Sequence, residues 1–515
     1  MLNSVQDAHE CDASPNGWPG GHPKPNSIPS ARFKINVLQQ FNINNMRYTK
    51  NILAATLLLA FTSLTQARGS VYNIRTYGAV GDGKTNDAQA IQKAVDACNA
   101  AGGGTVLVPA GSKYLAGPFN LKSFVEFYVE TGATVLASPN ENLYTQSAFK
   151  ENKGEGTIWI GGENIQQVSI DGGGIIDGNG ISFMGAEDGD SYDLKPFNIV
   201  DPRPHLMTII GCNTLRIHDI TIRNSAYWTV HLVGCTDVAI SDVSILNSVK
   251  IRNSDGIDLD HSKQVRINNC NIESGDDGIC FKNRREYAEY GPCENITVNN
   301  CILTSSSCAI KIGSENMDSI RHIIISNCII HNSNRGLGIQ NRDEGTVTDV
   351  TFSNIKIETH LFSDVWWGKA EPISITAYRR ASTNNKDAGW RLPKGKTQGS
   401  VGNVANIYFN NIQATGENGV YVSGESQDKI TGIYFNQVDI TLAKTTALQS
   451  GVYDRRPSQA EGIVHGNTCG FYFDTAGSID VKNCSVHRKA ALPSYFGKAL
   501  EQHNVMALLV SGMVE

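Results

Sequence analysis

Val265–Ser274 (VRINNCNIES) and Ile296–Ser305 (ITVNNCILTS) share one pattern, which decides the fold. Apolar and polar residues alternate, pass through a polar pair ending in Asn, and alternate again. A period of two indicates strand, turn and strand, and argues against a helical repeat. Related decapeptides begin at Leu215, Val238, Ile323, Val350, Ile407, Ile433 and Ile479.

One coil of this kind cannot bury its apolar face alone, so successive coils must stack. The sequence therefore predicts an all-β protein, a right-handed parallel β-helix over residues 71–490. An amphipathic helix is expected at residues 87–101, where Ile91, Ala94, Val95 and Cys98 share one face and would cap the first coil. Residues 491–515 lose the repeat and are expected to form a C-terminal tail or cap.

Two further columns follow from the repeat. The turn position should form a ladder of side-chain hydrogen bonds, and it is occupied by Asn269, Asn300, Asn327, Asn354 and Asn411. The next position should be a small apolar core column rather than a disulfide framework, and it is occupied by Cys270, Cys301, Cys328 and Cys484.

The N-terminal part of the chain reads as a targeting segment. The apolar run Ile52–Leu64 is too short to span a bilayer comfortably. Basic residues precede it and Ala67 follows, so residues 46–67 are interpreted as a signal peptide, and the protein as secreted or periplasmic with no membrane attachment after cleavage. A buried helix is the alternative. Residues 1–45 are interpreted as a polar leader that arises from a misassigned start. The net charge of −6 gives no basic footprint for nucleic acid.

Six segments align by their alternation and predict two outward columns on neighbouring coils, about 4.8 Å apart. They are WTVHLV, DGIDLD, DGICFK, CAIKIG, RGLGIQ and EPISIT. The first column contains Trp228, Asp255, Asp277, Cys308, Arg335 and Glu371. The second contains His231, Asp258, Cys280, Lys311, Gly338 and Ser374.

Three carboxylates are therefore predicted to meet. Asp255 stacks on Asp277, and Asp276 lies beside them. Like charges raise at least one pKa, which leaves a proton available near neutral pH. Glycoside hydrolysis needs such a set, with one acid for the leaving oxygen and one base for water. A Ca²⁺ site or a solvated acidic turn remains an alternative.

The motifs IDGGGIIDGNG, RPHLMTIIGC, NSDGID and SGDDGI resemble those of glycoside hydrolase family 28, the polygalacturonase family, from about residue 71 to 484. The resemblance implies Asp276 as general acid, Asp255 and Asp277 as activators of water, and inversion at the anomeric carbon. Two motifs depart from the family. Ser307-Cys308-Ala309 stands where the family has Gly-His-Gly, and residues 338–340 (Gly-Ile-Gln) stand where it has Arg-Ile-Lys.

The family's histidine supports its aspartates, and its Arg/Lys pair grips a sugar carboxylate. Displaced positive charge from Lys282, Lys311 and Arg335 could compensate, although each could also be a solvated basic residue. The other expected substrate-binding residues are Trp228, His231, Trp366, Trp367 and Glu371, with the tryptophans stacking on sugars or serving as buried anchors.

The predicted function is a secreted, inverting hydrolase of an acidic plant cell-wall polysaccharide, galacturonan or rhamnogalacturonan, without metal or cofactor. The insertion at residues 379–402 would wall one end of the groove and give exo-action. A Ca²⁺-dependent polysaccharide lyase and a non-catalytic glycan-binding β-helix are the alternatives.

Overall fold

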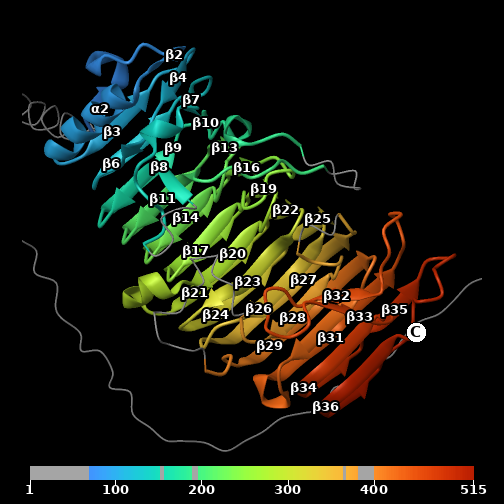
Figure 1. Cartoon of the computed structure of the whole chain (residues 1–515). Coiled ribbons are helices and arrows are strands. Elements are labelled where there is room, and N and C mark those ends of the chain that lie inside the picture. The colour runs from blue at the N-terminus through green and yellow to red at the C-terminus, as the bar shows by residue number, and fades with distance from the viewer. Residues whose placement is uncertain (1–68, 151–155, 188–194, 363–366, 381–398) are drawn as a thin grey trace, which may run out of the picture. The chain divides into compact units, whose positions relative to one another are not determined.

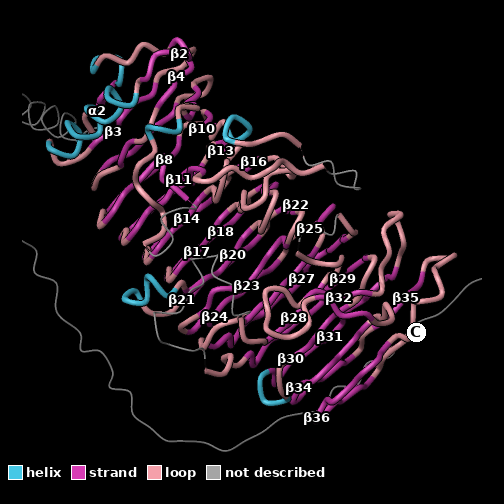
Figure 2. The backbone as a smooth tube through the Cα atoms, viewed as in Figure 1, coloured by secondary structure: helices cyan, strands magenta, loops and turns pink. Residues whose placement is uncertain are grey.

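The computed structural model describes residues 69–150, 156–187, 195–362, 367–380 and 399–515. All but two of its described strands join in one 34-stranded sheet, in which each strand pairs in parallel with strands of neighbouring coils (Figures 1 and 2). Because parallel crossovers are right-handed, the sheet coils as a right-handed parallel β-helix. The predicted fold class is confirmed.

The strands stack in three columns. The first contains β1 Val71–Asn73, β3 Gly104–Val108, β6 Val125–Val129, β9 Gln166–Asp171, β12 Asn213–His218, β15 Thr236–Ser241, β18 Lys263–Asn268, β21 Cys293–Asn299, β24 Ser319–Ser326, β27 Thr346–Thr359, β29 Val404–Gly416, β31 Ile430–Leu442, β34 Phe471–Lys482 and β36 Leu500–Ser511. The second contains β2 Asp82–Asn86, β4 Lys113–Ala116, β7 Thr134–Ala137, β10 Ile175–Asp177, β13 Thr221–Arg223, β16 Ser244–Leu246, β19 Asn271–Ser274, β22 Ile302–Ser305, β25 Ile329–Ser333, the second halves of β27, β29 and β31, and β35 Ser485–Arg488.

The third column carries the candidate site. It contains β5 Phe119–Asn120, β8 Gly156–Glu163, β11 Arg203–Ile210, β14 Val230–Val233, β17 Ile257–Asp260, β20 Ile279–Asn283, β23 Cys308–Asn316, β26 Arg335–Asn341, β28 Ile373–Ala377, β30 Val420–Gly424 and the first residues of β34. A separate antiparallel hairpin is formed by β32 Val452–Asp454 and β33 Ile463–His465.

The N-terminal end is capped by the predicted helix, α2 Ala88–Ala100. Its Ala-rich sequence favours a helix, and it buries the apolar face formed by Ile91, Ala94, Val95 and Cys98. Only short 3-10 turns accompany it among the described residues: η1 Ile74–Tyr77, η2 Glu141–Leu143, η3 Gly180–Phe183, η4 Arg285–Tyr290 and η6 Gln427–Lys429.

The turn asparagines have left-handed backbones, with φ of 55° at Asn269 and 56° at Asn327. Asn tolerates this conformation better than other residues that have a Cβ. Asn411 donates to Asn354 (2.8 Å) and Asn354 to Asn327 (3.2 Å), which confirms this part of the ladder. Asn327 then donates to Asn299 rather than to the expected Asn300. The ladder therefore changes column at that coil.

The core contains the predicted cysteine column, whose four side chains are buried and form no disulfide. At the C-terminal end, residues 500–511 form β36, which pairs in parallel with β34 as the last strand of the first column. The segment is therefore a terminal strand rather than a loose tail. Its outer side leaves Met506, Leu509 and Val510 exposed.

The leader and signal-peptide interpretations concern residues 1–67, which lie outside the described residues. Where the structure describes the chain, it contains no helix with the length and apolar character needed to cross a bilayer.

Candidate active site

Strand pairing confirms both predicted columns. The third-column strands are in register at Val230, Ile257, Ile279, Ile310, Leu337 and Ile373. The residue two positions earlier on each coil lies at or just before the start of its strand, next to the turn from the second column. Trp228, Asp255, Asp277, Cys308, Arg335 and Glu371 therefore form one row, as predicted from the alternation.

Three aspartates meet at the centre of this row. Carboxylate oxygens of Asp255, Asp276 and Asp277 all lie within 4.8 Å of one another. Asp255 and Asp277 are buried, and Asp276 is half-buried. Such a set of oxygens could also hold a cation such as Ca²⁺. The geometry alone thus fits either proton transfer or cation binding.

The hydrogen bonds to the three carboxylates differ. The backbone N–H of Asn253 donates to Asp276 (3.1 Å). The hydroxyl of Ser307 donates to Asp277 (3.2 Å). Asp255 has an oxygen, Oδ1, that no described group binds. The three environments are therefore unequal, which is what separate acid and base roles require.

Burial raises the pKa of Asp255 well above its usual value, and the neighbouring acids, first Asp258 and then Asp276 and Asp277, raise it further. Burial, followed by repulsion from Asp277, also raises the pKa of Asp276, while Lys311 opposes the change. The cluster therefore retains a proton at a pH at which an isolated, solvent-exposed carboxylic acid would lose it.

Lys311 binds inside this cluster. Its Nζ lies 2.7 Å from Oδ2 of Asp277, and the side chain is buried. The Nζ also lies 5.8 Å from the ring centroid of Trp367. The alternative that Lys311 is a solvated basic residue is wrong, because the long side chain reaches back one coil to a buried acid.

Arg335 also forms a buried ion pair. Its guanidinium binds Glu371 at 3.2 and 3.3 Å, and both side chains are buried. The solvated alternative is wrong for Arg335 too, because its side chain is buried. Binding of a substrate carboxylate by Arg335 stays a prediction, and so does a substrate contact of Glu371.

Lys282 lies beneath the row. Its Nζ is 3.6 Å from Asp258 and 3.5 Å from Glu315, and it is 4.6 Å from the ring centroid of Trp228. His231 is fully buried, 3.5 Å from Asp260. Burial lowers the pKa of His231, and the neighbouring carboxylate of Asp260 opposes this change. These residues form the floor of the site, and their contact with substrate stays a prediction.

Of the two tryptophans expected to stack on sugar, Trp366 lies outside the described residues. The described Trp367 is half-buried, and its carbonyl accepts a hydrogen bond from Asn334. The sequence missed the contacts of Ser307 and Asn253 with the aspartates. Both residues are the first residues of motifs that the sequence singled out, and that position was the available signal.

One segment covers the third column on the N-terminal side of the aspartates. The ring of Phe149 packs edge-on against Trp228 (centroids 5.2 Å apart) and against His205 (5.0 Å). The guanidinium of Arg284 lies over the Phe149 ring, 4.1 Å from its centroid. Phe149 is buried, so the face is closed one coil before Asp255.

The hairpin β32–β33 covers the column on the other side. The Asp454 backbone N–H donates to Glu371 (3.4 Å), and Arg342 donates to the carbonyl of Arg455 (2.7 Å). Gln340 donates to the carbonyl of Arg456 (3.4 Å). The hairpin therefore lies on β26 and β28. The sequence did not reveal it, because its strands have three residues each and lie outside the repeat.

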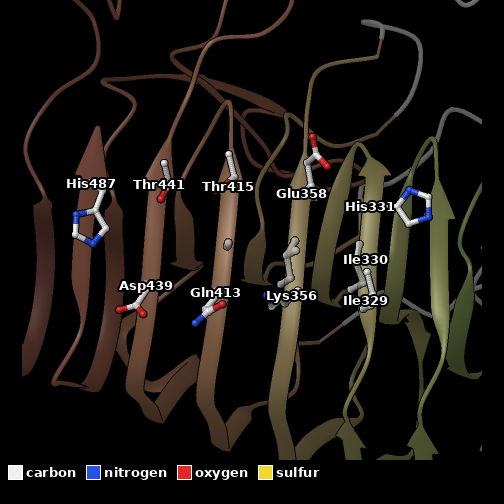
Figure 3. Close-up of a pocket in the computed structure, with 12 residues that line it drawn as sticks. Ile329, Ile330, His331, Lys356, Glu358, Gln413, Thr415, Asp439, Thr441 and His487 are labelled. Carbon is white, nitrogen blue, oxygen red and sulfur yellow. The ribbon is translucent and has the colours of Figure 1, made fainter. Parts of the chain in front are cut away.

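A groove of about 490 Å³ lies elsewhere, on the outer face of the second column (Figure 3). Two rows of side chains line it across β25, β27, β29, β31 and β35, with His331 and His487 at its ends. It contains none of the three aspartates. The groove is therefore separate from the candidate site.

Comparison with known proteins fits this site. The family model described as "Glycosyl hydrolases family 28" matches residues 98–455 of this chain. This covers more than half of the chain, and the chain belongs to that family.

Similar proteins have related names. A probable polygalacturonase of Vitis vinifera is 29% identical over 279 residues, which is 51% of this chain and 55% of that protein. An endo-polygalacturonase of Pectobacterium carotovorum subsp. carotovorum is 25% identical over 70% of this chain and 85% of its own. The solved family 28 exopolygalacturonase of Yersinia enterocolitica has a TM-score of 0.64 at 18% identity, covering 87% of this chain and 79% of that one. The chain spans about half the length of the first curated relatives it matches.

Proposed function

We propose that the protein is a glycosidase that hydrolyses a pectic polysaccharide, of galacturonan or rhamnogalacturonan type. Three buried or half-buried carboxylates within 4.8 Å of one another carry the proposal. Asp276, the most accessible of the three and with a raised pKa, serves as the acid that protonates the leaving oxygen. Asp277 and Asp255 face it and activate water.

Inversion of the anomeric configuration is proposed from the family motifs and from the hydrogen bonds that Asp277 accepts. Both of its oxygens are already bound, by Lys311 and by Ser307, which suits orienting a water better than bonding to a sugar carbon. The nearest oxygens of the cluster are closer than the roughly 6.5–9.5 Å between the carboxyls of an ordinary inverting pair. The anomer of the first product, followed by NMR, decides the point: a retained anomer contradicts the one-step mechanism.

Exo-action is supported by the two covered stretches of the third column. Phe149 closes the face at the coil of Trp228, and the hairpin β32–β33 closes it at the coil of Arg335. Only the coils of β17, β20 and β23 lie between them, at about 4.8 Å per coil. A stretch this short suits the end of a polysaccharide better than the middle. The expected wall at residues 379–402 falls largely outside the described residues.

The substrate class is proposed from the family and from the names of the relatives, which act on galacturonan according to those names. Export is proposed from the signal-like residues 46–67. Secretion into the medium of a signal-competent host, with cleavage after Ala67, tests it by N-terminal sequencing. Retention of an uncleaved chain inside the cell contradicts it.

The activity is tested by incubating the protein with polygalacturonate, xylogalacturonan and rhamnogalacturonan and identifying the released sugars. Exo-action predicts that reducing ends appear long before viscosity falls. A rapid fall in viscosity contradicts exo-action but leaves the glycosidase in place. Unsaturated products that absorb in the ultraviolet would identify a lyase, and no release from any fraction would favour a glycan-binding β-helix.

A further inference from the structure

We propose that Lys311 is a positioning residue whose ammonium holds the carboxylate of Asp277, so that the proton of the aspartate cluster is kept off Asp277 and is available to Asp276. The inference rests on the glycosidase function proposed above and deepens it. Three aspartates carry identical groups, so their own charges do not determine which one acts as acid and which as base. The ammonium of Lys311 supplies that difference.

The contact itself is close and protected. The ammonium lies 2.7 Å from one oxygen of Asp277, and the hydroxyl of Ser307 donates to the other oxygen at 3.2 Å. Lys311 is 5% exposed and Asp277 is 1% exposed. Hydrogen bonds to a charged group in a buried site are shorter and stronger than neutral ones. Water therefore screens this pair little.

The position of Lys311 in the coil explains why it selects Asp277. The backbone of Lys311 pairs with Cys280, so the side chain starts one coil beyond the aspartates and reaches back to the buried one. Its effect on Asp276 is weaker and indirect, through charge alone. One cation thus acts unequally on two adjacent carboxylates.

The other charged groups near the pair are engaged elsewhere. Lys282 lies between Asp258 and Glu315, and Arg335 binds Glu371. The titratable groups that face the pair from the surrounding strands are Asp255, Asp258, Asp276, Cys280, Lys282, Cys308, Glu315, Arg335 and Glu371. Among these, Lys311 alone makes an ion pair with an aspartate of the cluster.

The experiment compares the pH profiles of kcat/KM for the parent, Lys311→Met and Lys311→Arg on polygalacturonate and rhamnogalacturonan. Loss of the ammonium should move both limbs of the profile to higher pH by about one to two units, because both carboxylates lose a stabilising charge. Lys311→Arg should keep the limbs within half a unit, roughly. Lys356→Met removes an exposed lysine from β27 and should leave the profile unchanged.

A role of Lys311 in gripping a substrate carboxylate predicts something else. KM for acidic fractions would rise while the limbs stay in place, and that result overturns the proposal. Ser307→Ala serves as a second variant, since it weakens the hold on the other oxygen of Asp277. It should shift the limbs in the same direction by a smaller amount.

A measurement without substrate separates this proposal from the glycosidase itself. In Lys311→Met the folded cluster retains more protons than the unfolded chain over a wider pH range, so its stability should fall more steeply than the parent's from pH 4 to pH 7. Thermal unfolding at several pH values measures this. A difference in melting temperature that stays constant with pH overturns the role of Lys311, whereas inactivity of the parent on every pectic fraction overturns only the proposed function.

Discussion

Arg335 and Glu371 bind each other from adjacent coils of the same row, and neither is accessible to solvent. Glu371 also accepts the backbone N–H groups of Lys369 (2.6 Å) and Asp454 (3.4 Å). The pair therefore joins β26, the start of β28 and the covering hairpin. Its geometry indicates a structural part in closing the site.

Arg335→Met should destabilise the protein by about 3–5 kcal/mol, because it leaves the Glu371 carboxylate buried without its cation. Denaturant unfolding measures the loss. Arg321→Met is the matched control: its partner Glu294 is 2.8 Å away, but Arg321 is 40% exposed, so about 0–1 kcal/mol is expected. Adding Glu371→Gln to Arg335→Met should recover part of the loss. Equal effects of the two arginine variants would contradict a structural ion pair.

Asp276→Asn should lower kcat by several orders of magnitude, because an amide cannot deliver a proton to the leaving oxygen. Circular dichroism and melting temperature should stay near those of the parent. Glu273→Gln, an exposed carboxylate of β19 three residues earlier, is the control and should retain activity. Near-normal turnover of Asp276→Asn would remove the assignment of the acid.

Asp255→Asn should be inactive yet more stable than the parent at pH 7. The pKa of Asp255 is raised by burial and by its acidic neighbours, so the folded state binds its proton more tightly than the unfolded state. Stability then falls as pH rises from about 3.9 through the raised pKa. The gain in melting temperature should grow as the pH rises toward 7 and shrink toward about pH 3.5, where both states bind the proton. A gain independent of pH would mean that charge is not its cause.

Treatment with EDTA should leave hydrolysis unchanged, since the carboxylates act on protons directly and Lys311 already binds Asp277. Product release before and after chelation is the measurement. Loss of activity that Ca²⁺ restores would instead favour a lyase or a cation-dependent site at the three aspartates.

The alternation of the sequence was sufficient to predict which residues share a row. Ile257, Ile279 and Ile310 pair as the aligned frame requires, because a shift by one residue would expose the apolar set of a whole strand. The three aspartates followed from the same frame, and the capping helix followed from its own helical period. These features depend on short-range period and on stacking, both of which are written into each coil.

The burial of the outward rows could not be predicted in this way. Lys311 and Arg335 are covered because each finds an acid on a neighbouring coil and because segments outside the repeat pack over them. The hairpin that includes Arg455 and Arg456 has no alternating apolar pattern from which it could be predicted. The last strand, β36, was missed because Gly512 stands where most other coils have a turn Asn.

Phe149 and the hairpin β32–β33 bound the accessible part of the row. The distance between them can change only by whole coils. Phe149 closes the row at the coil of Trp228 and the hairpin closes it at the coil of Arg335, so the accessible length is a whole number of strand spacings. Duplication or deletion of one coil between them would lengthen or shorten the chamber by about 4.8 Å and leave the residues within each remaining coil in register. In such a scaffold, product size can evolve by discrete increments without any change to the chemistry.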